Sequence, residues 1–203
     1  MDQTSQIVEA SWLARPSTAV ASDLIGCTLV RYLPDGQVFR GLIVETEAYG
    51  PNDPACHAYV RRTQRNFVMF GPAGFTYIYL IYGMYYCLNI VTDGDGIASA
   101  VLVRALELTS IPAWIDASQA QKPHRIAAGP GKLCRALQID LSLTGQALQV
   151  GQGLWLEHRS SQLQQALDHQ AKQLVQTTRI GLTRGKDLPW RWYLAACASV
   201  SRP

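Results

Sequence analysis

Hydrophobic and polar residues alternate around position 45 in a way that predicts a strand with two unlike faces. If residues 41–49 are extended, successive side chains point to opposite sides of the strand. One face is apolar and can pack a core, and the other carries two acids and a tyrosine: Leu42, Val44, Thr46 and Ala48 against Ile43, Glu45, Glu47 and Tyr49. The acidic face fits either a functional site or the solvated face of an amphipathic edge strand. This stretch alone leaves both interpretations open.

The same periodicity predicts two β-hairpins. Residues 27–32 and 38–49 are strand-like and flank the turn signal Pro34-Asp35-Gly36. Residues 75–81 alternate, with Phe75, Tyr77, Tyr79 and Ile81 on one face, and residues 85–92 form the return strand. A tight turn over residues 82–84 then places Tyr82 at the tip of the second hairpin.

The remaining segments complete an α+β fold. Residues 98–106 are predicted to form a strand with Arg104 near its end, residues 132–137 a short helix, and residues 10–24 a partly helical segment that ends near Gly26. Residues 109–128 are irregular and polar, and the glutamine-rich residues 162–176 fit an exposed helix or a mobile segment. Residues 179–200 are expected to return to the core. We expect one domain over residues 1–203, with a largely antiparallel, hairpin-built sheet, flanking helices and a loose N-terminal segment at 1–10.

Composition narrows the class of protein. With 203 residues, 48% apolar and 16% charged, the chain can bury one large core. The net charge of +3 is ordinary, but residues 1–60 hold 3 basic and 7 acidic residues, whereas residues 61–203 hold 15 basic and 8 acidic ones. An acidic strand ahead of a basic remainder suits a polyanionic substrate whose reacting group is not the phosphate. Ordinary fluctuation in composition would produce the same asymmetry.

The cysteines and the apolar runs exclude several classes. The 5 cysteines are widely spaced without a Cys-x-x-Cys pair, so neither a zinc ribbon nor a redox dithiol is indicated, and a reducing compartment is expected. Cys27 and Cys87 lie in apolar runs and are expected to be buried core thiols. Residues 1–6 are polar and show no signal-peptide pattern. The longest apolar run, residues 75–91, is short for a membrane span and contains five tyrosines, so β-structure explains it better.

Four features follow one another between positions 45 and 85: an acidic strand, a histidine after a proline-bounded loop, an arginine-rich loop and a tyrosine-rich hairpin. Each alone has an ordinary structural explanation. Together they fit chemistry on a base in a duplex, because such a base must first leave the stack. A tyrosine such as Tyr82 can wedge into the gap, other aromatic faces can sandwich the base, and arginines can hold the flanking phosphates. A carboxylate such as Glu47 can deprotonate a water beside the sugar carbon.

An ordered set of motifs over about residues 20–200 closely resembles the alkyladenine (3-methyladenine) DNA glycosylase family. The most specific are Val44-Glu45-Thr46-Glu47-Ala48-Tyr49, Asp53-Pro54-Ala55-Cys56-His57-Ala58 and Tyr77-Ile78-Tyr79-Leu80-Ile81-Tyr82-Gly83-Met84-Tyr85. They are followed in order by Cys87-Leu88-Asn89, Val103-Arg104-Ala105-Leu106-Glu107, Gly129-Pro130-Gly131-Lys132-Leu133-Cys134, Arg179-Ile180-Gly181 and Asp187-Leu188-Pro189-Trp190. Any one of these motifs is weak evidence, but the ordered set is very specific.

The resemblance implies a monofunctional glycosylase without lyase activity, metal or other cofactor. It assigns water activation to Glu47, while Glu45 is expected to be structural or to tune Glu47, since two acids on one strand face should raise the pKa of one. It assigns stacking on the extruded base to Tyr49, His57 and Tyr79, and intercalation into the duplex to Tyr82. It also assigns exclusion of the guanine amino group to Asn89 and a place near the water and phosphate to Arg104. Arg61, Arg62 and Arg65 are candidate phosphate contacts.

The implied reaction is excision of damaged purines from double-stranded DNA in base excision repair. Alkylated purines such as 3-methyladenine and 7-methylguanine are cationic, so they leave readily and favour electron-rich tyrosine faces. The sugar gains oxocarbenium character, which Glu47 can stabilise while it directs water. Neutral lesions of the hypoxanthine and ethenoadenine type need protonation as well, and the sequence identifies no acid for that step. We expect a monomer without membrane association that acts in the cytoplasm, at the nucleoid, if the source is bacterial.

Two departures from the family pattern lie in one loop. The family usually has a proline where this chain has Gln64, and a glycine near Val60-Arg61-Arg62. Loss of the proline frees a backbone torsion and adds a donor, so a less rigid loop is expected.

Two other functions remain open at this stage. A binder of single-stranded nucleic acid would stack bases on Tyr77 and Tyr79, but it leaves Glu47 without a role. A hydrolase of another small glycoside or nucleoside would use Glu45 and Glu47 as a pair, because carboxylates two apart on a strand lie roughly 7 Å apart at the backbone.

Overall fold

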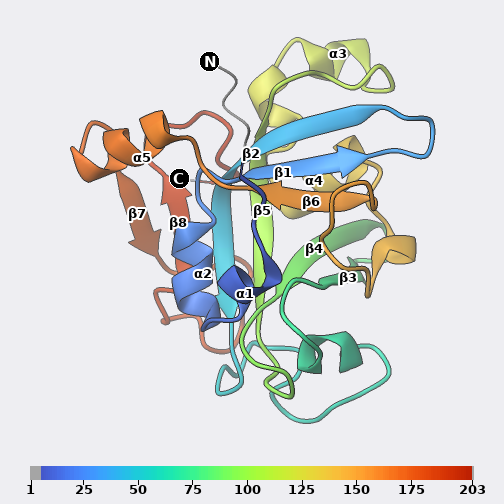
Figure 1. The fold of residues 1–203 in the computed structure, drawn as a ribbon, viewed down its shortest axis with the longest axis vertical. Coiled ribbons are helices and arrows are strands. Elements are labelled where there is room, and N and C mark those ends of the chain that lie inside the picture. Colours follow the sequence, from blue (N-terminus) through green and yellow to red (C-terminus); the bar gives the residue numbers. More distant parts are fainter. Residues whose placement is uncertain (1–5, 203) are drawn as a thin grey trace.

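One curled antiparallel sheet organises residues 6–202, the part of the chain that the computed structural model describes (Figure 1). The strands run in the order β3 (Thr76–Ile81), β4 (Tyr85–Val91), β5 (Ala100–Leu108), β2 (Val38–Tyr49), β1 (Thr28–Tyr32) and β6 (Leu154–Glu157). The sheet continues where β8 (Arg191–Leu194) pairs with β2, and β7 (Leu174–Thr177) pairs with β8. Each of these pairings is antiparallel, which confirms the predicted α+β fold with a hairpin-built sheet.

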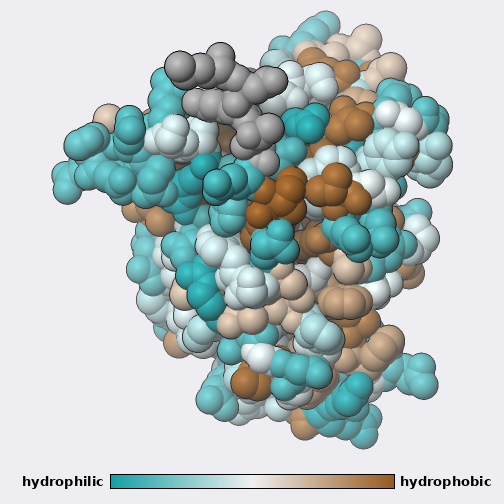
Figure 2. Space-filling model, viewed as in Figure 1, coloured by the Kyte–Doolittle hydropathy of each residue, from teal (hydrophilic) through white to brown (hydrophobic). Residues whose placement is uncertain are grey.

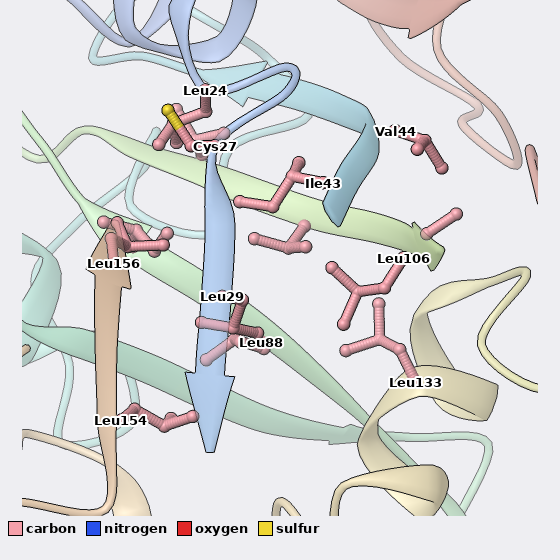
Figure 3. Packing of buried hydrophobic residues seen from close by; sticks show 14 of the residues in the cluster. Leu24, Cys27, Leu29, Ile43, Val44, Leu88, Leu106, Leu133, Leu154 and Leu156 are labelled. Atoms are coloured by element: carbon pink, nitrogen blue, oxygen red, sulfur yellow. The ribbon is translucent and has the colours of Figure 1, made fainter. Parts of the chain in front are cut away.

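Within residues 6–202, five short helices flank the sheet. They are α1 (Ala10–Leu13), α2 (Ser17–Asp23), α3 (Ala117–Ala120), α4 (Pro130–Ala136) and α5 (Ser161–Asp168), with short 3-10 turns at Phe67–Phe70, Pro123–Arg125 and Leu141–Leu143. Helix α2 packs on β2 and β5, and α4 packs on β4 and β5. The main core lies between these helices and the sheet, and Figure 3 shows leucines of β1, β4, β5, β6 and α4 meeting there. Full burial of each such side chain contributes roughly 1.5–3 kcal/mol.

Strand β2 is the central element for the site. Its first half pairs with β1, its second half pairs with β8, and β5 runs along its other edge. The register against β5 shifts between Ile43 and Glu45 and again between Glu45 and Thr46. The two shifts cancel, because Ile43 pairs with Leu106 and Glu47 with Leu102 in the same register. Thr46, on the predicted apolar face, donates its hydroxyl to the carbonyl of Ala21 in α2.

Several boundaries differ from the sequence prediction. The helical segment 10–24 is broken into α1 and α2 at Pro16, which has an extended ψ of 134°. Part of the segment predicted to be loose at 1–10 is ordered, because Val8 is buried and its amide donates to the carbonyl of Leu156; residues 1–5 lie outside the described part. The glutamine-rich stretch forms α5 followed by the unpredicted strand β7, and β6 was not predicted either.

The surface is mostly hydrophilic on the face shown in Figure 2, with smaller hydrophobic patches near β1 and β6. Cys27 and Cys87 are buried, as predicted, and all five cysteines are free thiols. Within residues 6–202, none of the helices combines the length and the apolar character needed to cross a membrane.

Candidate active site

The two acids of β2 share one arginine from the neighbouring strand. The Nε of Arg104 on β5 lies 2.9 Å from Oε1 of Glu45, and its Nη1 lies 3.2 Å from Oε1 of Glu47. Both acids have no exposed surface, and Arg104 is 7% exposed. Burial alone would lower the pKa of Arg104, but the two carboxylates outweigh burial and raise it, so this arginine stays charged. The amphipathic edge-strand interpretation of residues 41–49 is therefore wrong, because this acidic face is not solvated.

Glu45 is enclosed by structural partners. Its Oε1 accepts from the Nε of Arg191 at 2.8 Å, and its Oε2 accepts from the backbone amide of Ser201 at 2.7 Å. Burial acts to raise the pKa of Glu45, but Arg104, the Ser201 donors and Arg191 together hold that pKa below its ordinary value. Of the two acids, Glu45 is thus not the one whose pKa is raised. The intervening Arg104 replaces repulsion between the acids with attraction.

Glu47 has the same side chain but different surroundings. Its Oε2 accepts from the hydroxyl of Tyr49 at 2.8 Å, and its Oε1 accepts from the backbone amide of Ile180 at 2.8 Å and faces Arg104. A carboxylate offers about four acceptor positions. Three donors therefore fix the orientation of Glu47 and leave one acceptor position, on Oε2.

Glu47 and Arg104 lie at the wall of a cavity of about 370 Å³. Its other walls come from Tyr49, from the β3–β4 hairpin, from the start of α4 and from residues 180–182. A smaller hollow of about 120 Å³ adjoins it and is lined by His57, Tyr77 and Asn89. Tyr49 and Tyr79 line both spaces, so the predicted stacking residues do come together.

Tyr77 and Tyr79 hold His57 in place. Nδ1 of His57 lies 2.9 Å from the hydroxyl of Tyr77, and the ring of His57 meets the ring of Tyr79 edge-on with centroids 4.5 Å apart. Burial, helped by the charge of Arg65, lowers the pKa of His57, so the imidazole is neutral at pH 7. Burial also raises the pKa of Tyr77 to about 12, so this hydroxyl keeps its proton.

Asn89 projects from β4 into the smaller hollow with its amide orientation set. Its Nδ2 donates to the carbonyl of Tyr77 at 3.0 Å and to the carbonyl of Cys87 at 3.3 Å. Both amide protons are thus engaged with the backbone, and Oδ1 is the polar atom of the side chain without a partner in the described structure.

Tyr82 lies at the hairpin tip, as predicted, with 79% of its surface exposed. Tyr82 and Gly83 both adopt positive φ angles, of 53° and 69°, and the amide of Met84 donates to the carbonyl of Ile81. Two successive left-handed residues define a type I′ turn, which is easy for glycine but strained for tyrosine. An exposed, strained aromatic residue beside a cavity indicates a functional constraint rather than a packing role.

The arginine-rich loop is tied to the site by Asn66. The side chain of this buried residue accepts from the amide of Thr63 at 2.6 Å and donates to the carbonyls of His57 and Arg61. These hydrogen bonds cross-link the loop, and the lower rigidity expected from Gln64 stays a prediction. All three arginines of the loop are exposed. The Cζ of Arg65 lies 5.4 Å from the ring centre of Tyr79, and the Cζ of Arg62 lies 5.5 Å from that of Phe70.

Sequence reasoning missed three contributors to this arrangement. Tyr77 orients His57, the amide of Ile180 binds Glu47, and Asp53 pairs with the buried guanidinium of Arg179. Each belongs to one of the motifs quoted above, so the signal was present in the sequence. Its meaning depends on contacts between residues that are far apart in the chain.

The geometry defines a class of enzyme. An acid held by three donors beside an aromatic hollow fits hydrolysis of a planar base from a sugar, and an exposed tyrosine next to it fits a duplex substrate. The chain belongs to the methylpurine-DNA glycosylase (MPG) family, whose family model matches residues 11–198.

Similar proteins support the same assignment over nearly the full chain. A protein of Trichodesmium erythraeum is 57% identical over 203 residues, which cover 98% of this chain and 98% of that protein. Proteins of a Synechococcus species and of Carboxydothermus hydrogenoformans are 54% and 44% identical, covering 94% and 97% of this chain and 96% and 99% of their own lengths. All three carry the name "Putative 3-methyladenine DNA glycosylase".

The protein is therefore a DNA glycosylase of the monofunctional 3-methyladenine type, a hydrolase of N-glycosyl bonds that acts in DNA repair. Its substrate is DNA. Neither the single-strand binder nor the hydrolase of free nucleosides fits this family.

Proposed function

We propose that the protein extrudes damaged purines from double-stranded DNA and hydrolyses their N-glycosidic bond with a water activated by Glu47, which leaves an abasic site. The proposed substrates are 3-methyladenine, 7-methylguanine, hypoxanthine and ethenoadenine. The observation that carries the proposal is that Glu47 lines the larger cavity while three donors fix its carboxylate and leave one acceptor position on Oε2. A water bound there has its proton acceptor in place.

The aromatic residues supply the base pocket. Tyr49, His57 and Tyr79 all line the smaller hollow, and the flat base stacks on these rings. The tyrosine faces are electron-rich and the imidazole is neutral, so a cationic alkylated base is favoured. The fixed amide of Asn89 crowds the additional amino group of guanine, which acts against unmodified guanine, whereas 7-methylguanine is cationic and leaves more readily.

The reaction needs one bond broken and one bond formed. As the bond between the sugar carbon and the base nitrogen breaks, its electron pair leaves with the base, and a cationic base becomes neutral. Glu47 takes a proton from the water, whose oxygen bonds to the sugar carbon. The buried carboxylate also stabilises the oxocarbenium character of the sugar.

The duplex contacts follow from the exposed residues. Tyr82 fills the gap that the extruded base leaves, and Arg61, Arg62 and Arg65 bind the backbone phosphates. Arg104 faces the cavity and serves both the water and the phosphate of the extruded nucleotide. We further propose that the enzyme acts as a monomer on double-stranded DNA, and in a bacterium in the cytoplasm at the nucleoid.

Base release from duplex oligonucleotides tests the proposal. Each duplex carries one of the four lesions, and hot alkali reveals the abasic site. Wild type is expected to release the base, and Glu47→Gln is expected to lose at least a hundredfold in single-turnover rate, because amide nitrogen cannot accept a proton. The matched control is Glu107→Gln, an exposed acid on β5, which should retain the wild-type rate.

Three results would change the assignment. Unaltered release by Glu47→Gln would move water activation to another group, and Glu45→Gln would be tested next. Release of one lesion but not the others would narrow the substrate list. Lesion binding without release by the wild type would contradict the proposed mechanism.

A further inference from the structure

Arg179 is fully buried, although it lies in a loop ahead of β8. The side chains of Arg179 and Asp53 both have no exposed surface. The carboxylate of Asp53 accepts hydrogen bonds from both Nη groups of Arg179, and Nη2 lies 2.8 Å from Oδ1. Nη1 also donates to the carbonyl of Ala48 at 2.8 Å, and Nη2 to the carbonyl of Gly185 at 3.1 Å. The pair therefore joins the end of β2 to the loop that follows it and to the C-terminal part of the chain.

The same guanidinium lies against the ring of Tyr49. Its Cζ is 4.7 Å from the centre of that ring and 5.3 Å from the centre of the Trp190 ring. Tyr49 lines both hollows of the site, and its hydroxyl is bound to Glu47. A cation thus stands beside the ring on which a flipped base would stack.

The residue after Arg179 reaches the reacting group directly. The amide of Ile180 is one of the three donors on Glu47, and it follows the anchored Arg179 without an intervening residue. The position of the Arg179 side chain therefore sets both the Tyr49 ring and one donor to the Glu47 carboxylate.

We propose that Asp53 and Arg179 are positioning residues of the glycosylase, and that Asp53 neutralises a guanidinium that would otherwise repel a cationic base stacked on Tyr49. The inference rests on the proposed function. Among the described residues around the site, three buried carboxylates face three buried guanidiniums: Glu45, Glu47 and Asp53 with Arg104, Arg179 and Arg191. Loss of Asp53 alone leaves one uncompensated positive charge next to the base pocket.

This surplus charge would act on lesions according to their own charge. A cationic base on Tyr49 and the guanidinium on the other side of that ring would lie about two stacking distances apart, roughly 8 Å. At this distance in a partly buried site, repulsion between like charges changes the equilibrium for binding the base about tenfold or more. A neutral base on the same ring is affected far less. A purely structural role for Asp53 predicts equal losses for both kinds of lesion.

The test compares 7-methylguanine with ethenoadenine in otherwise identical duplexes at neutral pH. The measured quantity is the ratio of the two single-turnover release rates on one preparation, because this ratio is independent of the folded fraction. Asp53→Asn is expected to lower the ratio of 7-methylguanine to ethenoadenine release about tenfold. Asp168→Asn at the end of α5 makes the same chemical change far from the site and should leave the ratio unchanged.

A second variant removes the opposite charge. Arg179→Gln leaves Asp53 uncompensated, so the ratio is expected to rise or, if the carboxyl takes up a proton, to stay within twofold of wild type. The double variant Asp53→Asn with Arg179→Gln restores neutrality and should return the ratio to within twofold of wild type, even if both absolute rates are low. If Asp53→Asn yields no folded protein, the double variant Asp53→Asn with Arg179→Lys is assayed in its place. Its cation is shorter but still uncompensated, so the ratio should fall severalfold, whereas Arg179→Lys alone keeps the Asp53 carboxylate and should stay within twofold of wild type. A ratio within twofold of wild type in both variants overturns the inference.

Two outcomes overturn the inference. One is a ratio that stays within twofold of wild type in Asp53→Asn while both rates fall, since that result makes the pair a structural support only. The other is a fall of the ratio in both Asp53→Asn and Arg179→Gln. Failure of the proposed function is distinguishable, because wild type itself would then release neither lesion.

Discussion

Glu45 and Glu47 show how surroundings give one residue type two uses. They lie two positions apart on β2 and contact the same arginine, yet Glu45 is enclosed by Arg104, Arg191 and Ser201, whereas Glu47 borders a cavity. A carboxylate enclosed by cations and amide donors is a structural anchor. A carboxylate with a free acceptor position beside a cavity is available for chemistry.

Substitution of Glu45 should mainly reduce stability. Glu45→Gln leaves two buried arginines with one compensating carboxylate fewer, and breaking a buried ion pair in this way typically costs about 3–5 kcal/mol. Urea denaturation should show this loss in the free energy of unfolding. Glu107→Gln, at an exposed position, should change it by less than about 0.5 kcal/mol. Equal stability of both variants would contradict the anchoring role.

The lowered pKa of Glu45 also predicts a pH dependence. Because the pKa in the folded state lies below the ordinary value of 4.5, the ionised form stabilises the fold at pH values above 4.5. This contribution is lost as the pH falls below 4.5 and through the folded-state pKa. Urea midpoints measured over this range should fall more steeply for wild type than for Glu45→Gln, which has no proton to gain there. Parallel curves would show that Glu45 is not the group responsible.

Substitution of Tyr82 by glycine should lower activity without lowering the stability of the fold. Tyr82→Gly relieves a left-handed strain of about 1–2 kcal/mol and adds roughly 0.5–1 kcal/mol of unfolded-state entropy, so the fold should be unchanged or up to about 1 kcal/mol more stable. Lesion release from duplex DNA should nevertheless fall at least tenfold. Thermal unfolding and single-turnover release measure the two effects. Tyr32→Ala, a half-exposed tyrosine on β1, is the control and should not reduce release.

At the scale of elements, the tip of the β3–β4 hairpin packs against the start of α4, and together they form one wall of the larger cavity. A Cβ added to Gly131 in the first turn of α4 would lie 2.9 Å from the Cβ of Tyr85, which is closer than real contacts allow. The opposite end of α4 is held by Arg31, which donates to the carbonyls of Leu137 and Gln138. The start of α4 and the start of β4 therefore approach each other only because position 131 is glycine.

Gly131→Ala should push the start of α4 away from Tyr85 at the start of β4. We expect a loss of about 1–3 kcal/mol in the free energy of unfolding from overpacking, together with slower base release, because Tyr85 and Tyr82 line the same cavity. Gly94→Ala is the matched control, since a Cβ there makes only an ordinary contact at 3.8 Å. Chemical denaturation and single-turnover release on both variants test the expectation. Wild-type behaviour of Gly131→Ala would mean that α4 can move without affecting the site.

At the scale of the whole molecule, charge is divided between a neutral interior and a basic exterior. The buried acids are matched by buried arginines, while Arg61, Arg62 and several other basic residues of the second part of the chain remain exposed. Such an arrangement lets the surface attract phosphate while the reacting acid stays screened from it.

Binding to duplex DNA should accordingly weaken steeply with salt. If Arg62 contacts a phosphate, Arg62→Gln should reduce the slope of log affinity against log salt by about 0.9 and weaken binding equally for damaged and undamaged DNA. Lys172→Gln, an exposed position beside β7 on the branch of the sheet that β8 joins to β2, should leave the slope unchanged. Fluorescence anisotropy at several salt concentrations measures both. A wild-type affinity that does not depend on salt would contradict the duplex model.

The sequence by itself determined strands β1 to β5, the two hairpins and the family. Alternation in β2 and β3, the turn residues between strands and the ordered motifs are local signals, and they predicted the positions of Glu47, Tyr79 and Tyr82 in the fold. Strands β6 and β7 were not predicted, because each is only four residues long and too short to show a clear alternation of apolar and polar residues.

Only the tertiary structure decided which acid borders the cavity and what holds it there. The partners of the acids come from β5, from residues 179–180 and from Ser201. These contacts join residues that are 59 to 156 positions apart. No local period encodes them, because each depends on how separate elements pack and on which buried charges must be paired.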